Sequence, residues 1–271
     1  MRLITILFSG VILFTSCSNF SKVVKSNDYE YKLRVAEKYY AEKDYNHAQQ
    51  LFEELFRVFK GSEHFEDIYY KFAYCAFYLK DYPNAENLFK GFVEVFPNSN
   101  KAEEMDYMRA FTFYQQSPKV ELDQTNTTKA IGFMQAFVNT HPGSDKVKDA
   151  TEIIEKCRAK LEMKDFQSAQ LYYDLGYFKA AGVAVNVLMN TYPDSEKSDV
   201  YKLLIIKADY DYAQQSVPEK QNDRFETVIT QCNEFMDRFP DSKYKSTVQE
   251  YLSTTQTNIK SLKNEQVKKA S

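Results

Sequence analysis

Residues that form turns are scarce in this sequence. Among 271 residues there are only 7 Gly and 7 Pro, whereas average usage would give about 32 of the two together. A β-sandwich or β-barrel needs such residues every few positions, because each strand must end in a turn. A many-stranded fold is therefore excluded, and the composition favours helices.

Tryptophan and an excess of basic charge are also missing. The 21 Phe and 21 Tyr still supply enough apolar material for a core, and charged residues make up 27% of the chain. We therefore expect a folded protein rather than a disordered one. The formal net charge of −3 provides no positive field, so nucleic-acid binding driven by counter-ion release is disfavoured.

Metal-binding motifs are absent as well. No C-x-x-C or H-x-x-x-H pair occurs, and the three histidines stand singly. A zinc site would need several such ligands at short spacing. No metal site and no cofactor are predicted, and Cys75, Cys157 and Cys232 are expected to be buried in helices.

One mainly apolar stretch occurs, at the N-terminus. Residues 3–14 follow Arg2 and are too few to cross a bilayer as a helix, but they have the form of a signal-peptide core. Residues 13–17, Leu-Phe-Thr-Ser-Cys, resemble the lipobox of bacterial lipoproteins. We expect a lipoprotein signal peptide over residues 1–16 and palmitate-type acylation of Cys17. An ordinary signal peptide with a chance cysteine is the alternative.

The acyl chains on Cys17 would anchor the mature protein. Two or three chains are enough for stable membrane attachment. Ser18 follows the cysteine, and by resemblance to lipoprotein sorting this residue favours the outer membrane, with the body of the protein in the periplasm. Residues 17–27 are predicted to be a lipidated N-terminus and tether.

One pattern of side chains recurs five times along the rest of the chain. Each copy starts with an aromatic residue, followed by Ala three positions later, apolar residues at seven and ten, an aromatic at fourteen and Pro at fifteen. These offsets place the side chains on one stripe of a helix that the proline ends. The copies tolerate one or two departures and begin at Tyr45, Tyr82, Thr127, Phe178 and Phe225.

A partner helix is predicted upstream of each copy. In the second repeat it covers residues 65–80, and its small residue recurs at a spacing of 37 as Ala36, Ala73 and Ala110. Small residues let two helices pack closely. The serine that follows the proline, as at Ser195, is expected to cap the next helix.

Helix pairs of this kind, with small residues at set positions and a proline after the second helix, resemble the tetratricopeptide repeat. The resemblance covers about residues 28–242. It predicts an all-α fold, a superhelical stack of about five tetratricopeptide-like helix pairs with a C-terminal capping helix. An ordinary amphipathic helical bundle is the alternative, but it would not produce five copies of one offset pattern.

The repeats suggest the domain organisation. We predict N-terminal repeats one to three over residues 28–143, and C-terminal repeats four and five with linking and capping helices over residues 144–262. A disordered tail is expected over residues 263–271, which are polar and rich in lysine. Insertions are expected as a loop at residues 117–123, a linking helix at 145–163 and a loop at 214–223.

No catalytic signature accompanies the repeats. The glycine-rich phosphate loop, G-x-S-x-G and H-E-x-x-H are all missing. Neighbouring carboxylates such as Glu53 and Glu54 point about 100° apart on a helix, so they do not form a facing acid and base. We predict that the protein is not an enzyme.

A superhelical stack presents a concave groove lined by the first helix of each repeat, and such grooves bind extended peptides. Aromatic side chains gather on the expected groove side, which would suit an aromatic partner. The alternative for each aromatic is packing in the core between repeats. The candidate groove residues are Glu37, Tyr40, Tyr70, Tyr74, Phe77, Tyr78, Tyr107, Phe111 and Tyr114.

Three helix ends carry a more specific resemblance. They are Phe-Pro-Asn-Ser at 96–99, His-Pro-Gly-Ser at 141–144 and Tyr-Pro-Asp-Ser at 192–195. With the lipobox, the chain length and the linking helix, they are similar to the BamD family, the lipoprotein subunit of the outer-membrane β-barrel assembly machine. The resemblance implies a non-enzymatic scaffold that helps fold and insert β-barrel proteins.

The same resemblance implies the partners. C-terminal repeats of the family dock on the periplasmic domains of a BamA-like barrel insertase, and the N-terminal groove receives unfolded outer-membrane proteins with aromatic ends. Another tetratricopeptide-repeat envelope adaptor, one that coordinates cell-wall or Tol-Pal proteins, is the alternative. Such adaptors usually carry a coiled-coil segment and no lipid, unlike this sequence.

Overall fold

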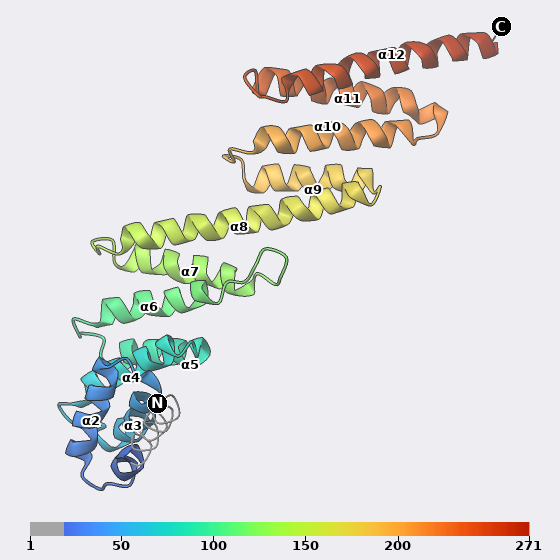
Figure 1. Cartoon of the computed structure of the whole chain (residues 1–271). Helices are drawn as coiled ribbons and strands as arrows, with labels where there is room; N and C mark the ends of the chain where they lie inside the picture. The colour runs from blue at the N-terminus through green and yellow to red at the C-terminus, as the bar shows by residue number, and fades with distance from the viewer. Residues whose placement is uncertain (1–18, 271) are drawn as a thin grey trace, which may run out of the picture. The chain divides into compact units, whose positions relative to one another are not determined.

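The computed structural model describes residues 19–270, and all regular secondary structure in this range is helical (Figure 1). Side chains are described as far as residue 264. The chain forms two compact units, of which unit 1 ends at Arg158 and unit 2 begins at Ala159. The predicted signal peptide and the lipidation site Cys17 lie outside the described residues.

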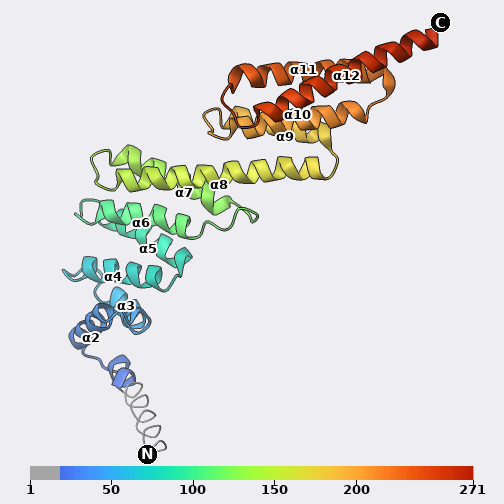
Figure 2. The same ribbon diagram turned by 45° about the horizontal axis from the view of Figure 1, so that its top comes forward.

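Unit 1 contains three helix pairs and the start of a long helix, and each helix of the pairs packs against the next along the chain. Its helices alternate in direction (Figure 2). The pairs are α2 (Tyr29–Ala41) with α3 (Tyr45–Val58), α4 (Phe65–Tyr78) with α5 (Tyr82–Val95), and α6 (Ala102–Gln115) with α7 (Thr125–Thr140).

Unit 2 contains the second part of α8 (Val147–Asp174) and four more helices. The last helix packs against α11 and also contacts α10, which is the position of a cap. Together the two units confirm the predicted all-α stack of helix pairs with a C-terminal capping helix. The helices are α9 (Phe178–Thr191), α10 (Ser198–Gln214), α11 (Pro218–Arg238) and α12 (Lys245–Ala270).

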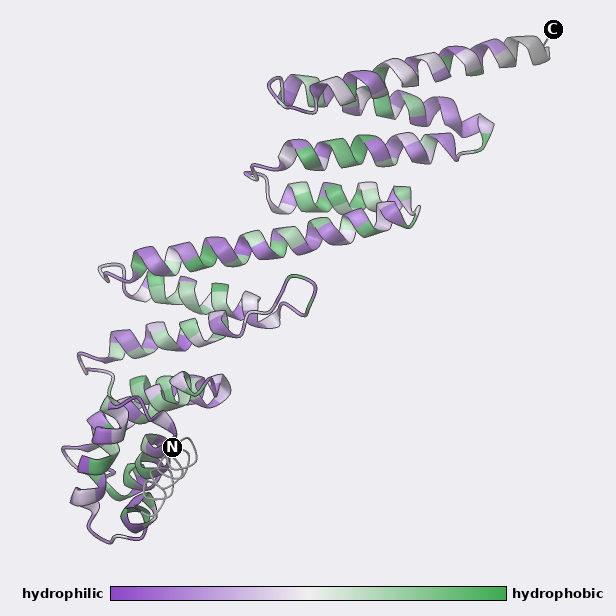
Figure 3. Ribbon diagram, in the orientation of Figure 1, coloured by the Kyte–Doolittle hydropathy of each residue, from purple (hydrophilic) through white to green (hydrophobic). Residues whose placement is uncertain are grey.

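The repeated stripe of the second helices forms the centre of each core. Positions three, seven and ten of all five copies are at most 1% exposed. Figure 3 shows the result in α9, which is largely hydrophobic, whereas α12 is mostly hydrophilic. The fifteen buried residues are Ala48, Phe52, Leu55, Ala85, Phe89, Phe92, Ala130, Met134, Phe137, Ala181, Val185, Leu188, Val228, Cys232 and Phe235.

The serine after each proline has a different role from the predicted one. Helix α10 begins at Ser198 with Lys197 as its N-cap residue, so Ser195 lies two positions too early to cap it. Its hydroxyl accepts the Lys197 N–H and donates to Glu162 in the first helix of the same repeat. The prediction of a helix cap is therefore corrected to a link between successive repeats.

The same serine link occurs four times within the units. The hydroxyl reaches back to an acidic residue of the preceding first helix, which holds successive repeats in register. Such a bond to a carboxylate is stronger than one between neutral groups. The other links are Ser99 to Glu66 (2.7 Å), Ser144 to Glu103 (2.5 Å) and Ser242 to Asp199 (2.7 Å).

Three boundaries differ from expectation. The linking helix and the first helix of repeat four are one continuous helix, α8, because no Gly or Pro interrupts residues 147–174. The expected loop at 214–223 is reduced to residues 215–217, since Pro218 starts α11 at a position that suits proline. Helix α12 continues to Ala270 through the expected disordered tail, where Lys, Glu and Gln are good helix formers.

A close contact between helices explains one glycine. A Cβ at Gly91 of α5 would overlap the hydroxyl of Tyr69 in α4. Tyr69 is only 6% exposed, and its ring is held by Phe56, whose ring centroid is 4.7 Å away. The tyrosine cannot swing aside without disturbing this aromatic cluster. Gly132 of α7, by contrast, has nothing near the position of a Cβ.

Replacing these two helical glycines with alanine should therefore have opposite effects. Gly132→Ala should stabilise the protein by up to about 1 kcal/mol, because alanine is the better helix former. Gly91→Ala should destabilise it by about 1 kcal/mol or more, because overpacking outweighs that gain. Urea unfolding followed by circular dichroism measures both. Equal stabilisation by the two changes would contradict the Tyr69 contact.

Candidate functional site

The structure places all nine predicted groove residues on the first helices of unit 1, that is on α2, α4 and α6. They differ in exposure. Tyr74 and Tyr107 are buried, at 7% and 9%, whereas Tyr78 is 45% exposed. The core-packing alternative therefore applies to Tyr74 and Tyr107. The half-buried members are Glu37, Tyr40, Tyr70, Phe77, Phe111 and Tyr114.

Three tyrosines form a row along α4. Tyr70, Tyr74 and Tyr78 are four residues apart, so they lie on one face of the helix. The ring centroids of Tyr70 and Tyr74 are 4.8 Å apart, and those of Tyr74 and Tyr78 are 5.7 Å apart. Tyr45 of α3 stacks on Tyr78 with the centroids at 4.4 Å. We call these four residues the tyrosine row.

Glu104 of α6 binds the buried end of the tyrosine row. The Tyr70 hydroxyl lies 3.3 Å from both of its carboxylate oxygens, and the Tyr74 hydroxyl donates to the same carboxylate. Burial and then the Glu104 charge raise the pKa of Tyr70 to about 12, and burial with the hydrogen bond to Glu104 raises the pKa of Tyr74 further. Both hydroxyls stay neutral hydrogen-bond donors.

A row of charges joins the same three helices. Lys71 of α4 binds Glu37 of α2 at 2.7 Å and Asp67 of its own helix at 3.0 Å. Lys101, which precedes α6, binds Asp67 at 2.6 Å and lies 5.1 Å from the centroid of the Tyr70 ring. The Lys101 hydrogen bond is the main cause of the lowered pKa of Asp67. Positions on successive first helices are therefore fixed by ion pairs.

Sequence reasoning missed two members of this surface. Tyr45 was assigned only to the repeat pattern, and Glu104 was not singled out. The spacing of 34 residues that joins Glu37 to Lys71 also joins Tyr70 to Glu104 and Asp67 to Lys101. That spacing would have identified the pairs.

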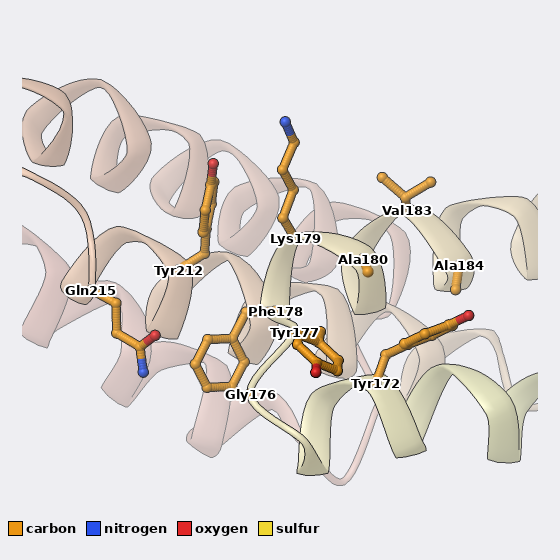
Figure 4. Close-up of a pocket in the computed structure, with 10 residues that line it drawn as sticks. All are labelled: Tyr172, Gly176, Tyr177, Phe178, Lys179, Ala180, Val183, Ala184, Tyr212 and Gln215. Atoms are coloured by element: carbon orange, nitrogen blue, oxygen red, sulfur yellow. The ribbon is translucent and has the colours of Figure 1, made fainter.

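Unit 2 carries an apolar hollow of about 740 Å³ that the sequence did not reveal (Figure 4). It lies where the end of α8, the start of α9 and the end of α10 meet. Tyr177 and Val183 are 62% and 59% exposed there, and Lys179 extends away from the aromatic rings (Figure 4). The lining residues are Tyr172, Gly176, Tyr177, Phe178, Lys179, Ala180, Val183, Ala184, Tyr212 and Gln215.

A half-buried carboxylate lies beside this hollow. Asp209 of α10 shares a smaller cavity with Val183 and Arg224, and the Arg224 guanidinium stacks on Tyr212 at 4.0 Å from the ring centroid. Burial raises the pKa of Asp209 to about 6, although the charge of Lys202 opposes the rise. Within residues 19–264 no group donates a hydrogen bond to Asp209. The hollow thus has an apolar floor with an acid and cations at its rim.

The cysteines lie in the cores as expected. Cys75, Cys157 and Cys232 are buried. Burial raises the pKa of the Cys75 thiol to about 12 and that of Cys232 to about 11, so these thiols are poor nucleophiles. Among the residues that the structure describes, no cluster of three metal-binding side chains occurs.

Comparison with known proteins gives the family. The sequence model of a family described as "YfiO: Outer membrane lipoprotein" matches residues 28–216, which is more than half of the chain. The chain belongs to this YfiO family. It is thus a tetratricopeptide-type outer membrane lipoprotein, and within residues 19–270 no helix is long and apolar enough to cross a membrane. The match begins at the N-cap of α2 and ends just after α10.

Solved repeat structures are similar to the chain at low identity. The TPR2AB domain of yeast Sti1 in complex with pHSP90 is 13% identical, with a TM-score of 0.41, covering 86% of this chain and 84% of that one. The P58(IPK) TPR domain is 14% identical with a TM-score of 0.42, covering 89% and 68%. A TPR repeats protein of Bacteroides fragilis is 13% identical with a TM-score of 0.40, covering 86% and 100%. No curated protein sequence matches the chain.

The raised pKa of Asp209 predicts a pH-dependent effect on stability. The pKa is about 6 in the folded state against an ordinary value near 3.9, so the folded protein loses stability as pH rises from about 4 to 6. Asp209→Asn should raise the free energy of unfolding by about 1 to 2 kcal/mol at pH 8, a figure reduced for partial exposure. The same change should have little effect at pH 4.

Urea unfolding at the two pH values measures this difference. Asp237→Asn is the matched control, because Asp237 is exposed on α11 and should change stability equally at both. An Asp209→Asn effect of the same size at pH 4 and pH 8 would contradict the raised pKa of Asp209.

Proposed function

We propose that this YfiO-family lipoprotein is a non-enzymatic periplasmic scaffold of the outer-membrane β-barrel assembly machine. In this role it is anchored by lipid on Cys17 and helps β-barrel proteins fold and insert into the outer membrane. The single observation that carries the proposal is the family match over residues 28–216. The two surfaces described above, one in each unit, give it a physical basis.

Unit 1 supports binding of unfolded barrel segments. The tyrosine row offers ring faces, and Tyr78 is accessible at 45% exposure. Aromatic rings at centroid distances of 4.5 to 7 Å attract further aromatic side chains. Extended segments that end in aromatic residues have the chemistry this face would recognise. The ion pairs around Lys71 hold α2 and α4 in place, so little ordering cost remains for binding.

Unit 2 supports docking of a folded partner, for which we propose the periplasmic domains of a BamA-like barrel insertase. Exposed Val183 and Val187 on α9, with Leu171 and Leu175 near the end of α8, are each 56% to 59% exposed. Val183 lines the hollow and Val187 follows one turn later on α9, and exposed apolar surface of this kind marks protein interfaces. Lys179 and Arg224 at its edge would set orientation by charge.

Isolation of the intact complex tests the proposal. A C-terminally tagged copy solubilised in mild detergent should bring down a barrel insertase at near-equal amount, identified by mass spectrometry. Val183→Glu should lower its recovery at least tenfold, because a charge would be buried in the apolar patch. Val95→Glu is the matched control, since Val95 is 52% exposed on α5 of unit 1 and should leave recovery unchanged.

Other outcomes of this experiment would redirect the function. Recovery of cell-wall enzymes or Tol-Pal proteins in place of an insertase would contradict the assembly-machine role and favour the adaptor. Loss of the insertase with Cys17→Ala, but not with Val95→Glu, would support the lipid anchor as part of the assembly.

A further inference from the structure

The segment just after Cys17 is a short helix fixed to repeat one. Residues 19–24 are helical, and the Phe20 ring lies 4.2 Å from the His47 ring and 5.7 Å from the Tyr39 ring, measured between centroids. Val23 is 5% exposed and belongs to the core of α2 and α3. We call residues 19–24 the leading helix. The sequence predicted only a lipidated N-terminus and tether over residues 17–27, without this helix.

The side of the leading helix that faces away from the core is basic. Lys22 follows Phe20 by two positions, so it lies about 200° around the helix from that packed side chain, and Lys25 comes directly after the last helical residue. Both lysines are exposed, and Val24, which precedes Lys25 in the sequence, is 42% exposed. Packing and charge are thus separated on the two faces of this segment.

The first repeat helix also has a face that none of the helices described in residues 19–270 covers. Tyr31, Arg34 and Lys38 are exposed at spacings of three and four along α2, and Tyr31 is 41% exposed. This stripe contains no carboxylate, although Glu42 lies 3.9 Å from Lys38 just past the end of α2. It lies about 100° around α2 from Tyr39, which the leading helix contacts.

Chain length then limits how far these faces are from a membrane. Only Ser18 separates Cys17 from the leading helix, and two residues span at most about 7 Å. The headgroup layer of one leaflet is about 5 to 8 Å thick. A lipid on Cys17 therefore holds residue 19 at the bilayer surface. Because Phe20 and Val23 are packed, repeat one is held there with it.

We propose that the leading helix connects repeat one rigidly to the membrane, so that a lipid surface is the partner of this end of unit 1. Lys22 and Lys25 face the lipid phosphates, which attract basic side chains near a membrane. Tyr31 lies at the interface, where tyrosine is favoured, beside Arg34 and Lys38. The inference rests on the lipid anchor of the proposed function and not on any protein partner.

The absence of tryptophan makes a direct test possible. Single-tryptophan variants Val24→Trp, Tyr31→Trp and Leu122→Trp of the full lipidated chain are placed in phosphatidylethanolamine and phosphatidylglycerol vesicles containing brominated lipids, which quench indole fluorescence at short range. Leu122 is 58% exposed in the loop between α6 and α7 and serves as the control. Quenching of at least twofold is expected at positions 24 and 31, and none at 122.

A second variant distinguishes a rigid connection through the leading helix from attachment by a flexible tether. Phe20→Ala with Val23→Ser removes the packing of the leading helix and keeps the lipid. Position 24 should then stay quenched, whereas quenching at position 31 should fall by half or more. Circular dichroism checks that the repeats remain folded.

Three results would overturn the proposed rigid connection between repeat one and the membrane. They are no quenching at position 31 in the parent chain, unchanged quenching there after undocking, and an intact mass without lipid on Cys17. Because the readout needs no insertase, these results are distinguishable from failure of the assembly-machine proposal in the isolation experiment.

Discussion

Burial of one stripe on the second helix of every repeat is the constraint on which the rest of the structure depends. A small residue in four of the five copies, followed by two larger apolar ones, is nearly inaccessible to solvent in each. This burial supplies the apolar contact that a repeat cannot make alone. The first helices bury further residues against this stripe, and in unit 1 their remaining faces carry most of the tyrosine row and the ion pairs.

Polar contacts then fix the register of successive first helices, which apolar packing alone does not determine. Each serine after the helix-ending proline binds a carboxylate one first helix earlier, as Ser99 binds Glu66. Ion pairs such as Lys71 with Glu37 link successive first helices in the same way. The tyrosine row is therefore built on helices whose mutual positions are fixed, which suits a binding surface better than a loop does.

The sequence predicted the elements governed by periodicity. The stripe beginning at Tyr45 and its four relatives located the second helices, because offsets of three, seven and ten have one geometric solution in a helix. The same reasoning could not decide the exposure of Tyr74, since a tyrosine suits both a core and a groove. It also missed the carboxylate partner, Glu104, which is distant in sequence.

Other features had weaker signals or none. The apolar hollow of unit 2 depends on how α9 meets α10, and α9 was seen only as a core helix. The packing of Phe20 and Val23 rests on just two apolar positions, too few for periodicity to detect. Asp209 gave no signal, because its unusual environment comes from burial that only tertiary structure creates.

The central claim is that the exposed end of the tyrosine row receives unfolded barrel proteins. Photo-crosslinking in living cells tests it most directly, with a photoreactive phenylalanine analogue in place of Tyr78 and, as control, of Val95, which is similarly exposed. The account predicts that newly made outer-membrane barrel proteins crosslink at position 78 and not at position 95. Equal crosslinking at the two positions, or none at 78, would contradict it.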